Sequence, residues 1–193
     1  AEFVAAVANA GAFACLSSVM FQTNEELREG IRKTRNLTDK PFGVNINLFP
    51  MFKPVDIELY IDTVVQEGVQ VIETSGRSPE PYVERIKKHD VKLMHKCARV
   101  RDAKTAERVG ADILEVVGFE CAGHPSTEEV TTLVLAPQVV DAVKVPVIAG
   151  GGFCDARGFV AALALGAEGV LMGTRFMITR ECAIHQKFKE ALV

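Results

Sequence analysis

Two turns of small residues, which each follow an apolar stretch, are the part of this sequence best suited to bind a ligand. The first turn comes directly after residues 145–149, a short run rich in β-branched residues. Glycine has no Cβ atom, so its backbone N–H groups can approach a ligand closely, and such turns bind phosphate where a helix begins. The pattern predicts a phosphate site, with tight turns that bind nothing as the alternative. The residues are Gly150, Gly151 and Gly152 in the first turn, and Gly173 and Thr174 in the second.

Polar residues also stand near the ends of other apolar runs. An ammonium group such as that of Lys96 is costly to bury unless it meets an anion or an electron-rich ligand atom. We therefore predict that Lys96 contacts a bound cofactor, and a pair with a carboxylate such as Glu73 is the alternative. Asn45 could hold a sugar-like chain or a ring edge, or it could bond the backbone at a strand end. His95 is predicted to be structural.

His124 lies in a loop, directly after Ala122 and Gly123. A histidine there can act as a general base or as a donor that stabilises developing negative charge. Two alternatives start from Cys121: a nucleophile pair with His124, or a zinc site. The zinc ligands would come from the two C-x-x-H patterns, Cys121 with His124 and Cys182 with His185. Neither spacing by itself brings the groups together, so we predict no metal.

Strands and helices alternate along the whole sequence. The apolar runs predict strands over residues 13–17, 41–48, 69–74, 91–97, 112–117, 145–149 and 169–172. Helical periodicity and capping residues predict helices over residues 3–7, 25–35, 57–66, 79–88, 101–109, 130–143, 156–165 and 180–193, with Asn24 and Asp155 as N-caps. This alternation indicates βαβ units and a parallel sheet.

The predicted fold is a (β/α)8 TIM barrel. The chain opens on a helix, so we expect the barrel to lack its first strand here, in a single, incomplete domain over residues 1–193. An open, doubly wound sheet is the alternative. It is less well supported because no Gly-x-Gly-x-x-Gly follows an early strand and the phosphate turns come last.

Composition narrows the choice of partners. The chain has 193 residues, of which 48% are hydrophobic and 24% charged, with a net charge of −3. No basic run suggests nucleic acid, no apolar stretch is long enough to span a membrane, and no signal peptide is apparent at the start. The five cysteines are odd in number and widely spaced. This pattern predicts reduced thiols and a cytoplasmic protein.

Taken together, the motifs resemble those of the nitronate monooxygenase family, formerly called 2-nitropropane dioxygenases. The segments that carry the resemblance are Pro41-Phe-Gly-Val-Asn45, His95-Lys-Cys97, Gly118-Phe-Glu-Cys-Ala-Gly-His-Pro125, Ala149-Gly-Gly-Gly152 and Met172-Gly-Thr-Arg-Phe176. The family differs in having a first strand with a Gln-Gly-Gly-Met-like segment and a C-terminal extension. It also often has glycine where this chain has Ser126, and an acidic residue in place of Val117.

The resemblance implies an FMN-dependent TIM-barrel oxidoreductase. The FMN phosphate would lie at Gly151, Gly152, Gly173 and Thr174, with Gly150 beside it. Asn45 and Lys96 would contact the ring and ribityl parts, the backbone of Ala122 and Gly123 would lie near the ring edge, and His124 would be catalytic.

The implied reaction is oxidation of an alkyl nitronate with O2. One alternative is an FMN-dependent NAD(P)H oxidoreductase acting on quinones or enoyl thioesters, and another is a non-catalytic barrel fragment. The expected partners are small molecules. The sequence does not decide whether the chain forms a homo-oligomer.

Overall fold

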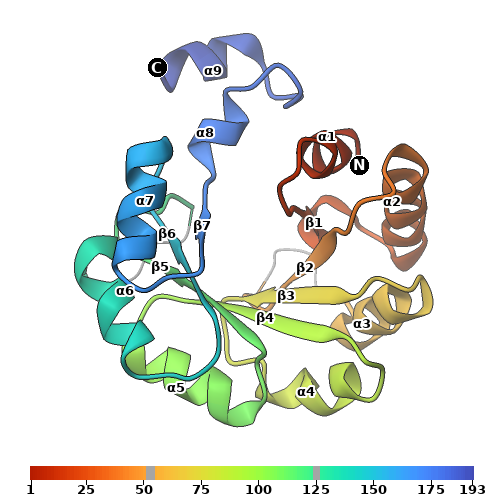
Figure 1. Ribbon diagram of the computed structural model, residues 1–193. Coiled ribbons are helices and arrows are strands. Elements are labelled where there is room, and N and C mark those ends of the chain that lie inside the picture. Colours follow the sequence, from red (N-terminus) through yellow and green to blue (C-terminus); the bar gives the residue numbers. More distant parts are fainter. Residues whose placement is uncertain (51–54, 124–126) are drawn as a thin grey trace. The chain divides into compact units, whose positions relative to one another are not determined.

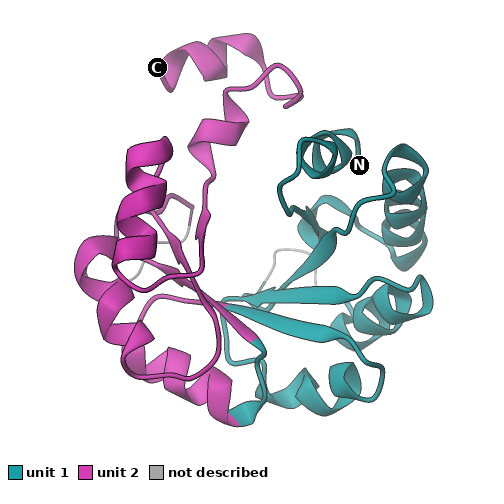
Figure 2. Ribbon diagram, viewed as in Figure 1, with its two compact units in different colours: residues 1–95, 109–112 teal, residues 96–108, 113–193 magenta. Residues whose placement is uncertain are grey.

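In a computed structural model, helices and strands alternate along the chain, which divides into two compact units (Figure 1). The structure describes residues 1–50, 55–123 and 127–193. Unit 1 comprises residues 1–95 and 109–112, and unit 2 comprises residues 96–108 and 113–193 (Figure 2).

Unit 1 begins with a helix and continues with parallel strands. Its elements are α1 (Glu2–Asn9), β1 (Cys15–Ser17), the 3-10 helix η1 (Ser18–Met20), α2 (Asn24–Leu37), β2 (Gly43–Asn47), α3 (Ile57–Gln66), β3 (Val71–Ser75), α4 (Glu80–Lys87) and the first part of β4 (Lys92–Cys97). Leu16 of β1 is level with Val44 of β2, which is level with Ile72 of β3. All three side chains are buried and contribute to the core of this unit.

The start of α2 differs from the sequence prediction. Thr23, not Asn24, is the N-cap, and its hydroxyl accepts a hydrogen bond from the backbone N–H of Glu26 at 3.2 Å. Asn24 already belongs to the first helical turn, and its side-chain oxygen accepts a hydrogen bond from the Thr63 hydroxyl of α3. A capping residue must have a non-helical backbone, and Thr23 meets that condition with φ −129° and ψ 159°.

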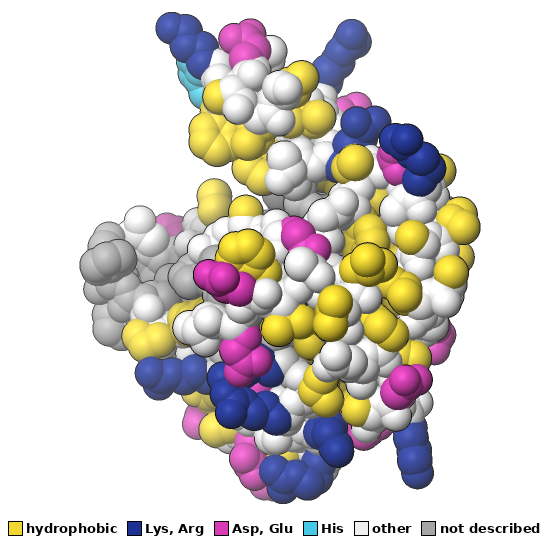
Figure 3. Space-filling view, turned by 90° about the vertical axis from the view of Figure 1, so that its left-hand side faces the viewer, with side chains coloured by type: hydrophobic (Ala, Val, Ile, Leu, Met, Phe, Trp, Pro, Cys, Tyr) yellow, Lys and Arg dark blue, Asp and Glu magenta, His cyan; other side chains and the backbone are white. Residues whose placement is uncertain are grey.

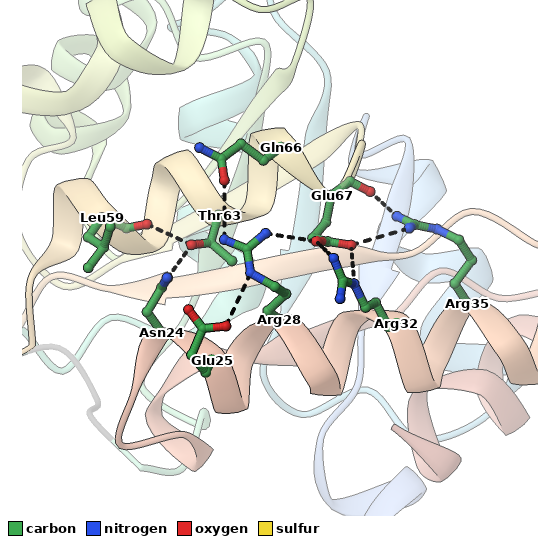
Figure 4. A network of polar contacts seen from close by, with 9 residues as sticks. All are labelled: Asn24, Glu25, Arg28, Arg32, Arg35, Leu59, Thr63, Gln66 and Glu67. Carbon is green, nitrogen blue, oxygen red and sulfur yellow. Dashed lines mark hydrogen bonds and ion pairs between the residues drawn. The ribbon is translucent and has the colours of Figure 1, made fainter.

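Glu67, which follows α3, forms ion pairs with three arginines of α2 (Figure 4). Its side chain is only 7% exposed. Arg28 lies 2.8 Å and Arg32 2.9 Å from Oε1, and Arg35 lies 3.7 Å from Oε2. Hydrogen bonds from Arg32 and Arg28 hold the pKa of Glu67 below its usual value. The carboxylate therefore ties the end of α3 to one side of α2.

Replacing Glu67 by Gln should lower the free energy of unfolding at pH 7 by about 1–3 kcal/mol, because hydrogen bonds to a charged group are lost where water has little access. A carboxyl with a depressed pKa stabilises the fold above its unfolded pKa of about 4.3, and this contribution is lost as the pH falls. Urea unfolding at several pH values should thus show the difference between Glu67→Gln and the parent shrinking in acid. The matched control is Glu25→Gln, since Glu25 is 75% exposed and lies 3.5 Å from Arg28. An equal effect of both substitutions would contradict this assignment.

Unit 2 continues the alternation. Its elements are the end of β4, most of α5 (Val100–Val109), β5 (Ile113–Val117), α6 (Thr132–Val140), β6 (Val147–Gly150), α7 (Ala156–Ala164), β7 (Gly169–Leu171), α8 (Thr174–Met177) and α9 (Gln186–Ala191). The strands β5, β6 and β7 are parallel neighbours, with Val117 level with Gly150 and Gly150 level with Leu171. A core of alanines lies between this sheet and its helices, formed by Ala136, Ala149, Ala162 and Ala167.

The predicted cap of α7 is confirmed. The Asp155 carboxylate accepts hydrogen bonds from the backbone N–H groups of Arg157 at 3.0 Å and Gly158 at 3.2 Å. Beyond the cap, α7 buries the small residue Ala162, whereas its larger apolar side chains are exposed. Together with two from α6 they give an apolar face (Figure 3), made of Leu133, Val134, Phe159, Val160 and Leu163.

The predicted fold class is confirmed. The described residues form seven parallel strands that alternate with helices. Within each unit the strands pair in chain order, whereas a doubly wound sheet reverses its order at a switch point. One element was predicted wrongly: residues 180–193 were expected to form one helix, but within them only Gln186–Ala191 (α9) is helical, and the short helix α8 lies before them, at the predicted Gly-Thr turn. The prediction of a single domain stays a prediction.

Candidate functional site

The glycine turn after β6 has a backbone that only glycine adopts readily. The φ angles of Gly151 and Gly152 are +99° and +80°, in the left-handed region. A Cβ atom on Gly151 would lie 2.8 Å from the Thr132 hydroxyl and 3.2 Å from the Cys121 backbone nitrogen. Gly150 is needed for a different reason, since a Cβ there would lie 3.0 Å from a methyl group of Val117. The turn therefore requires glycine for conformation and for close packing.

The second turn leaves room beside its glycine. Gly173 follows β7 and is the N-cap of α8, with φ −105° and ψ −75°. Among the described residues, a Cβ atom on Gly173 would meet no atom within 4 Å. Neither strain nor packing thus requires glycine here, whereas the close approach of a ligand would. Because Gly150 is level with Leu171, the two turns leave neighbouring strands at the same end of the sheet.

The loop after β5 lies against the first turn. The Phe119 N–H donates to the Val130 carbonyl at 2.8 Å, and the Cys121 N–H donates to the Gly118 carbonyl at 3.0 Å. Gly123 has φ +91°, and a Cβ atom there would meet no atom of the described residues within 4 Å. Ala122 and Gly123 are exposed. The predicted catalytic residue that follows them, His124, lies outside the described residues.

Lys96 has a carboxylate partner in unit 2. Its ammonium nitrogen lies 3.3 Å from Oε2 of Glu115, on β5, whose side chain is 5% exposed. A pair with a carboxylate was the alternative predicted for Lys96, with Glu73 as the example, and the carboxylate that it meets is Glu115. The Lys96 side chain is itself 27% exposed, so part of it remains accessible to a ligand.

Removing the charge of Lys96 should destabilise the fold because it leaves the Glu115 carboxylate buried without this cation. We expect Lys96→Met to lower the free energy of unfolding by about 2 kcal/mol, which is less than for a fully buried pair. The double variant Lys96→Met/Glu115→Gln should recover much of the loss. Lys104→Met is the control, since Lys104 is exposed on α5. If the double variant in urea unfolding is no more stable than Lys96→Met, the pairing does not account for the effect.

The cysteines near Lys96 are poor nucleophiles. Burial raises the pKa of Cys97 to about 12. Burial also raises the pKa of Cys121, although the nearby charge of Lys96 opposes the shift. Both thiols are therefore protonated near neutral pH, and thiolate is the reactive form. This argues against the nucleophile pair of Cys121 with His124. All five cysteines are free thiols.

Unit 1 has polar side chains near the ends of its own strands. Asn45, on β2, donates from Nδ2 to the Ser75 hydroxyl of β3 at 3.2 Å. His95 is 3% exposed and its Nδ1 lies 2.9 Å from the Thr74 hydroxyl, an arrangement that fits the structural role predicted for it. Asn45 is part-buried, and its amide already has one protein partner.

Unit 2 thus brings together the first glycine turn and the loop after β5, with the second glycine turn leaving the adjacent strand. Two residues that the sequence did not single out take part, Glu115 and Thr132, together with Glu120 of the segment Gly118–Pro125. Glu115 could have been noticed as the only charged residue in the apolar run of β5. In the parts of the chain that the structure describes, no group of three or more His, Cys, Asp or Glu residues could hold a metal ion. No helix among those residues is long and apolar enough to cross a membrane.

Comparison with known proteins identifies the family. The profile of the family described as nitronate monooxygenase matches residues 1–193, which is the whole chain. The chain belongs to the nitronate monooxygenase family. This is a family of oxidoreductases that are in general flavin-dependent. The family predicted from the sequence is therefore confirmed.

Two kinds of enzyme name occur among the curated relatives of this chain, dehydrogenase and nitronate monooxygenase. A protein of Rhodococcus jostii (strain RHA1), named (3aS,4S,5R,7aS)-5-hydroxy-7a-methyl-1-oxo-octahydro-1H-indene-4-carboxyl-CoA dehydrogenase, is 41% identical over 188 residues. These residues are 97% of this chain and 51% of the relative. A probable nitronate monooxygenase of Staphylococcus aureus (strain JH9) is 31% identical over 232 residues, which cover 100% of this chain and 65% of the relative. The chain spans about half to two thirds of the length of these relatives.

Solved structures agree with this fold. FabK from Thermotoga maritima is 38% identical, with a TM-score of 0.89 over 98% of this chain and 58% of that protein. Nitroalkane oxidase from Streptomyces ansochromogenes superposes with a TM-score of 0.87 over 98% of this chain and 65% of that protein. At 23% identity, the second likeness concerns the fold alone.

Proposed function

We propose that the protein containing this chain is an FMN-dependent oxidoreductase that oxidises alkyl nitronates with O2. One observation carries the proposal: the left-handed turn of Gly151 and Gly152 leaves the sheet beside a second turn whose Gly173 has open space around it. Family membership, and a relative named probable nitronate monooxygenase, support the choice of cofactor and reaction.

The residues at hand suit FMN. Backbone N–H groups at Gly151, Gly152, Gly173 and Thr174 are the proposed ligands of its phosphate, since close backbone approach and the absence of side chains favour an anion there. Lys96 and Asn45 would hold the ring and ribityl parts through the ammonium and amide groups, and Ala122 and Gly123 would face the ring edge. When bound, the flavin supplies the redox chemistry, accepting electrons from the substrate and passing them to oxygen.

The residues of the chain itself would supply a positive charge and a group that accepts a proton. Lys96 is cationic and partly exposed, so it favours an anionic substrate or cofactor near it. His124 would orient the nitronate, or take the proton from the carbon of a neutral nitroalkane, as the family resemblance implies. The second glycine turn leaves room for the cofactor, since a Cβ atom on Gly173 would meet no atom of the described residues within 4 Å.

A second candidate is an FMN-dependent NAD(P)H oxidoreductase acting on a thioester or a quinone. The specific observation in its favour is the 41% identity to a relative named as a carboxyl-CoA dehydrogenase, which exceeds the 31% to the probable nitronate monooxygenase. A thioester, like a nitroalkane, has an acidic C–H bond next to an electron-withdrawing group. The same histidine could serve both substrates. The two functions therefore differ in the compound that reduces the flavin, which is the nitronate in the first and NAD(P)H in the second.

The test is an anaerobic visible spectrum of the purified protein with FMN, recorded before and after substrate. Loss of the yellow absorbance on adding an alkyl nitronate alone is the expected result. Loss on adding NADH or NADPH, with none from the nitronate, would replace the first function with the second. A protein that takes up no flavin would contradict both and favour a non-catalytic fragment.

A further inference from the structure

A carboxylate from the loop after β5 caps the helix that follows it. Helix α6 has Thr131 as its N-cap, but the Thr131 side chain makes no capping hydrogen bond. The backbone N–H of Thr132 instead donates to both carboxylate oxygens of Glu120, at 2.9 and 3.1 Å. A negative charge at a helix N-terminus is favoured by the helix dipole. The cap therefore comes from a residue twelve positions earlier in the chain.

The same threonine reaches the glycine turn. Its hydroxyl lies 2.8 Å from the Gly150 carbonyl oxygen and 3.1 Å from Oε2 of Glu120. Both neighbours are acceptors and the hydroxyl has one proton, so it donates chiefly to Gly150, the shorter contact. Thr132 is 2% exposed, and its bond to the Gly150 carbonyl is buried, whereas its bonds with Glu120 are part-buried. The backbone of Thr132 thus holds the loop, and its side chain holds the turn.

The backbone around Thr132 is packed too closely for side chains on the neighbouring glycines. A Cβ atom on Gly118 would lie 2.2 Å from the Thr132 nitrogen, and one on Gly151 would lie 2.8 Å from the Thr132 hydroxyl. The Gly118 N–H also donates to the Gly150 carbonyl at 3.1 Å. The loop and the turn therefore meet at Thr132 and share one acceptor. A shift of either should be transmitted to the other.

We propose that Glu120 and Thr132 form a positioning pair, which fixes the loop after β5 against the glycine turn after β6. Resting on the proposed function, the pair sets where the Ala122–Gly123 backbone lies relative to the flavin phosphate. Neither residue handles the reacting atoms. Small misplacements of reacting groups are costly, and a shift of about 1 Å can reduce a rate by about 10²-fold.

The decisive variant is Thr132→Val, which keeps the shape of the side chain and removes the hydroxyl. We expect it to weaken FMN binding and to lower kcat at saturating FMN, each by about tenfold or more. Thr132→Ser, which restores the hydroxyl, should recover both. Thr131→Val is the matched control, and it should change neither quantity. Equal effects of Thr131→Val and Thr132→Val would overturn the proposal.

Glu120→Ala should act in the same direction as Thr132→Val, and Glu129→Gln is its control on the same loop. If the carboxylate of Glu120 instead only repelled the phosphate, Glu120→Ala would bind FMN more tightly than the parent. That result would overturn the proposal.

A readout without flavin separates this inference from the proposed function. Amide hydrogen exchange of the unliganded protein should be faster in residues 118–123 and 150–153 in Thr132→Val, and unchanged there in Thr131→Val. Faster exchange only at the start of α6 would show that Thr132 supports its own helix and would overturn the pairing. If the parent protein binds no flavin, the proposed function fails, and the exchange result still decides whether the pair exists.

Discussion

Replacing Gly151 by valine should abolish retention of FMN. The backbone at Gly151 has φ +99°, and a Cβ atom there would lie 2.8 Å from the Thr132 hydroxyl. A valine would thus strain the turn and clash with Thr132, which would displace the backbone N–H groups that are proposed to bind the phosphate. Purified Gly151→Val should be colourless after incubation with FMN and gel filtration, whereas the parent should be yellow. A fully loaded variant would refute the phosphate site.

Two further variants separate loss of ligand from loss of fold. Gly166, beyond the C-terminus of α7, has φ +89° and would place a Cβ atom 2.8 Å from Val140, so Gly166→Val carries a similar folding cost away from the turn. It should retain FMN if it folds. Gly173→Val introduces a side chain into open space with an unstrained backbone, so it should fold normally and still lose FMN. Colour in Gly173→Val would contradict the second half of the phosphate site.

Replacing His124 by alanine should leave FMN bound and slow oxidation of the substrate by about 10²-fold or more, the usual contribution of a general acid or base. His124 lies outside the described residues, so this expectation rests on its place in the loop sequence and on the family resemblance. The measurement is the rate of anaerobic flavin bleaching by the neutral nitroalkane, with flavin content measured in parallel. His89→Ala, at an exposed position after α4, is the control.

His124→Gln distinguishes the two roles considered for this histidine. Glutamine can donate a hydrogen bond but cannot take a proton near neutral pH. With a preformed nitronate, partial recovery would favour orientation by a hydrogen bond. With the neutral nitroalkane, no recovery is expected, because the proton must then be removed. Turnover by His124→Ala equal to that of the parent would exclude either role.

Most of the fold follows from local patterns in the sequence. The bounds of α3, the cap at Asp155 and the glycine turn after β6 were all predicted, because apolar periodicity, a capping residue and consecutive glycines are local signals. The family was recognisable for the same reason, since its motifs are short segments. The position of the α2 cap was off by one residue, because Thr23 and Asn24 are both good capping residues and only the backbone angles distinguish them.

The contacts that hold the candidate site together are not local. Glu115 was missed as the partner of Lys96 because the two residues lie on different strands, and sequence spacing does not tell which carboxylate a strand-end lysine will meet. Glu120 and Thr132 were missed because a helix cap is sought next to the helix, and this one comes from an earlier loop. The final helix was predicted too long because residues 180–185, which precede α9, contain no glycine or proline that would mark a helix boundary.

The most direct test of the central claim compares FMN with riboflavin, which differs from it only by the phosphate. Titration of the purified protein, followed by flavin fluorescence, gives both dissociation constants. If the glycine turns bind the phosphate, FMN should bind at least about 100-fold more tightly, a difference of about 2.7 kcal/mol. Equal affinity for the two flavins, or no binding of either, would contradict the account.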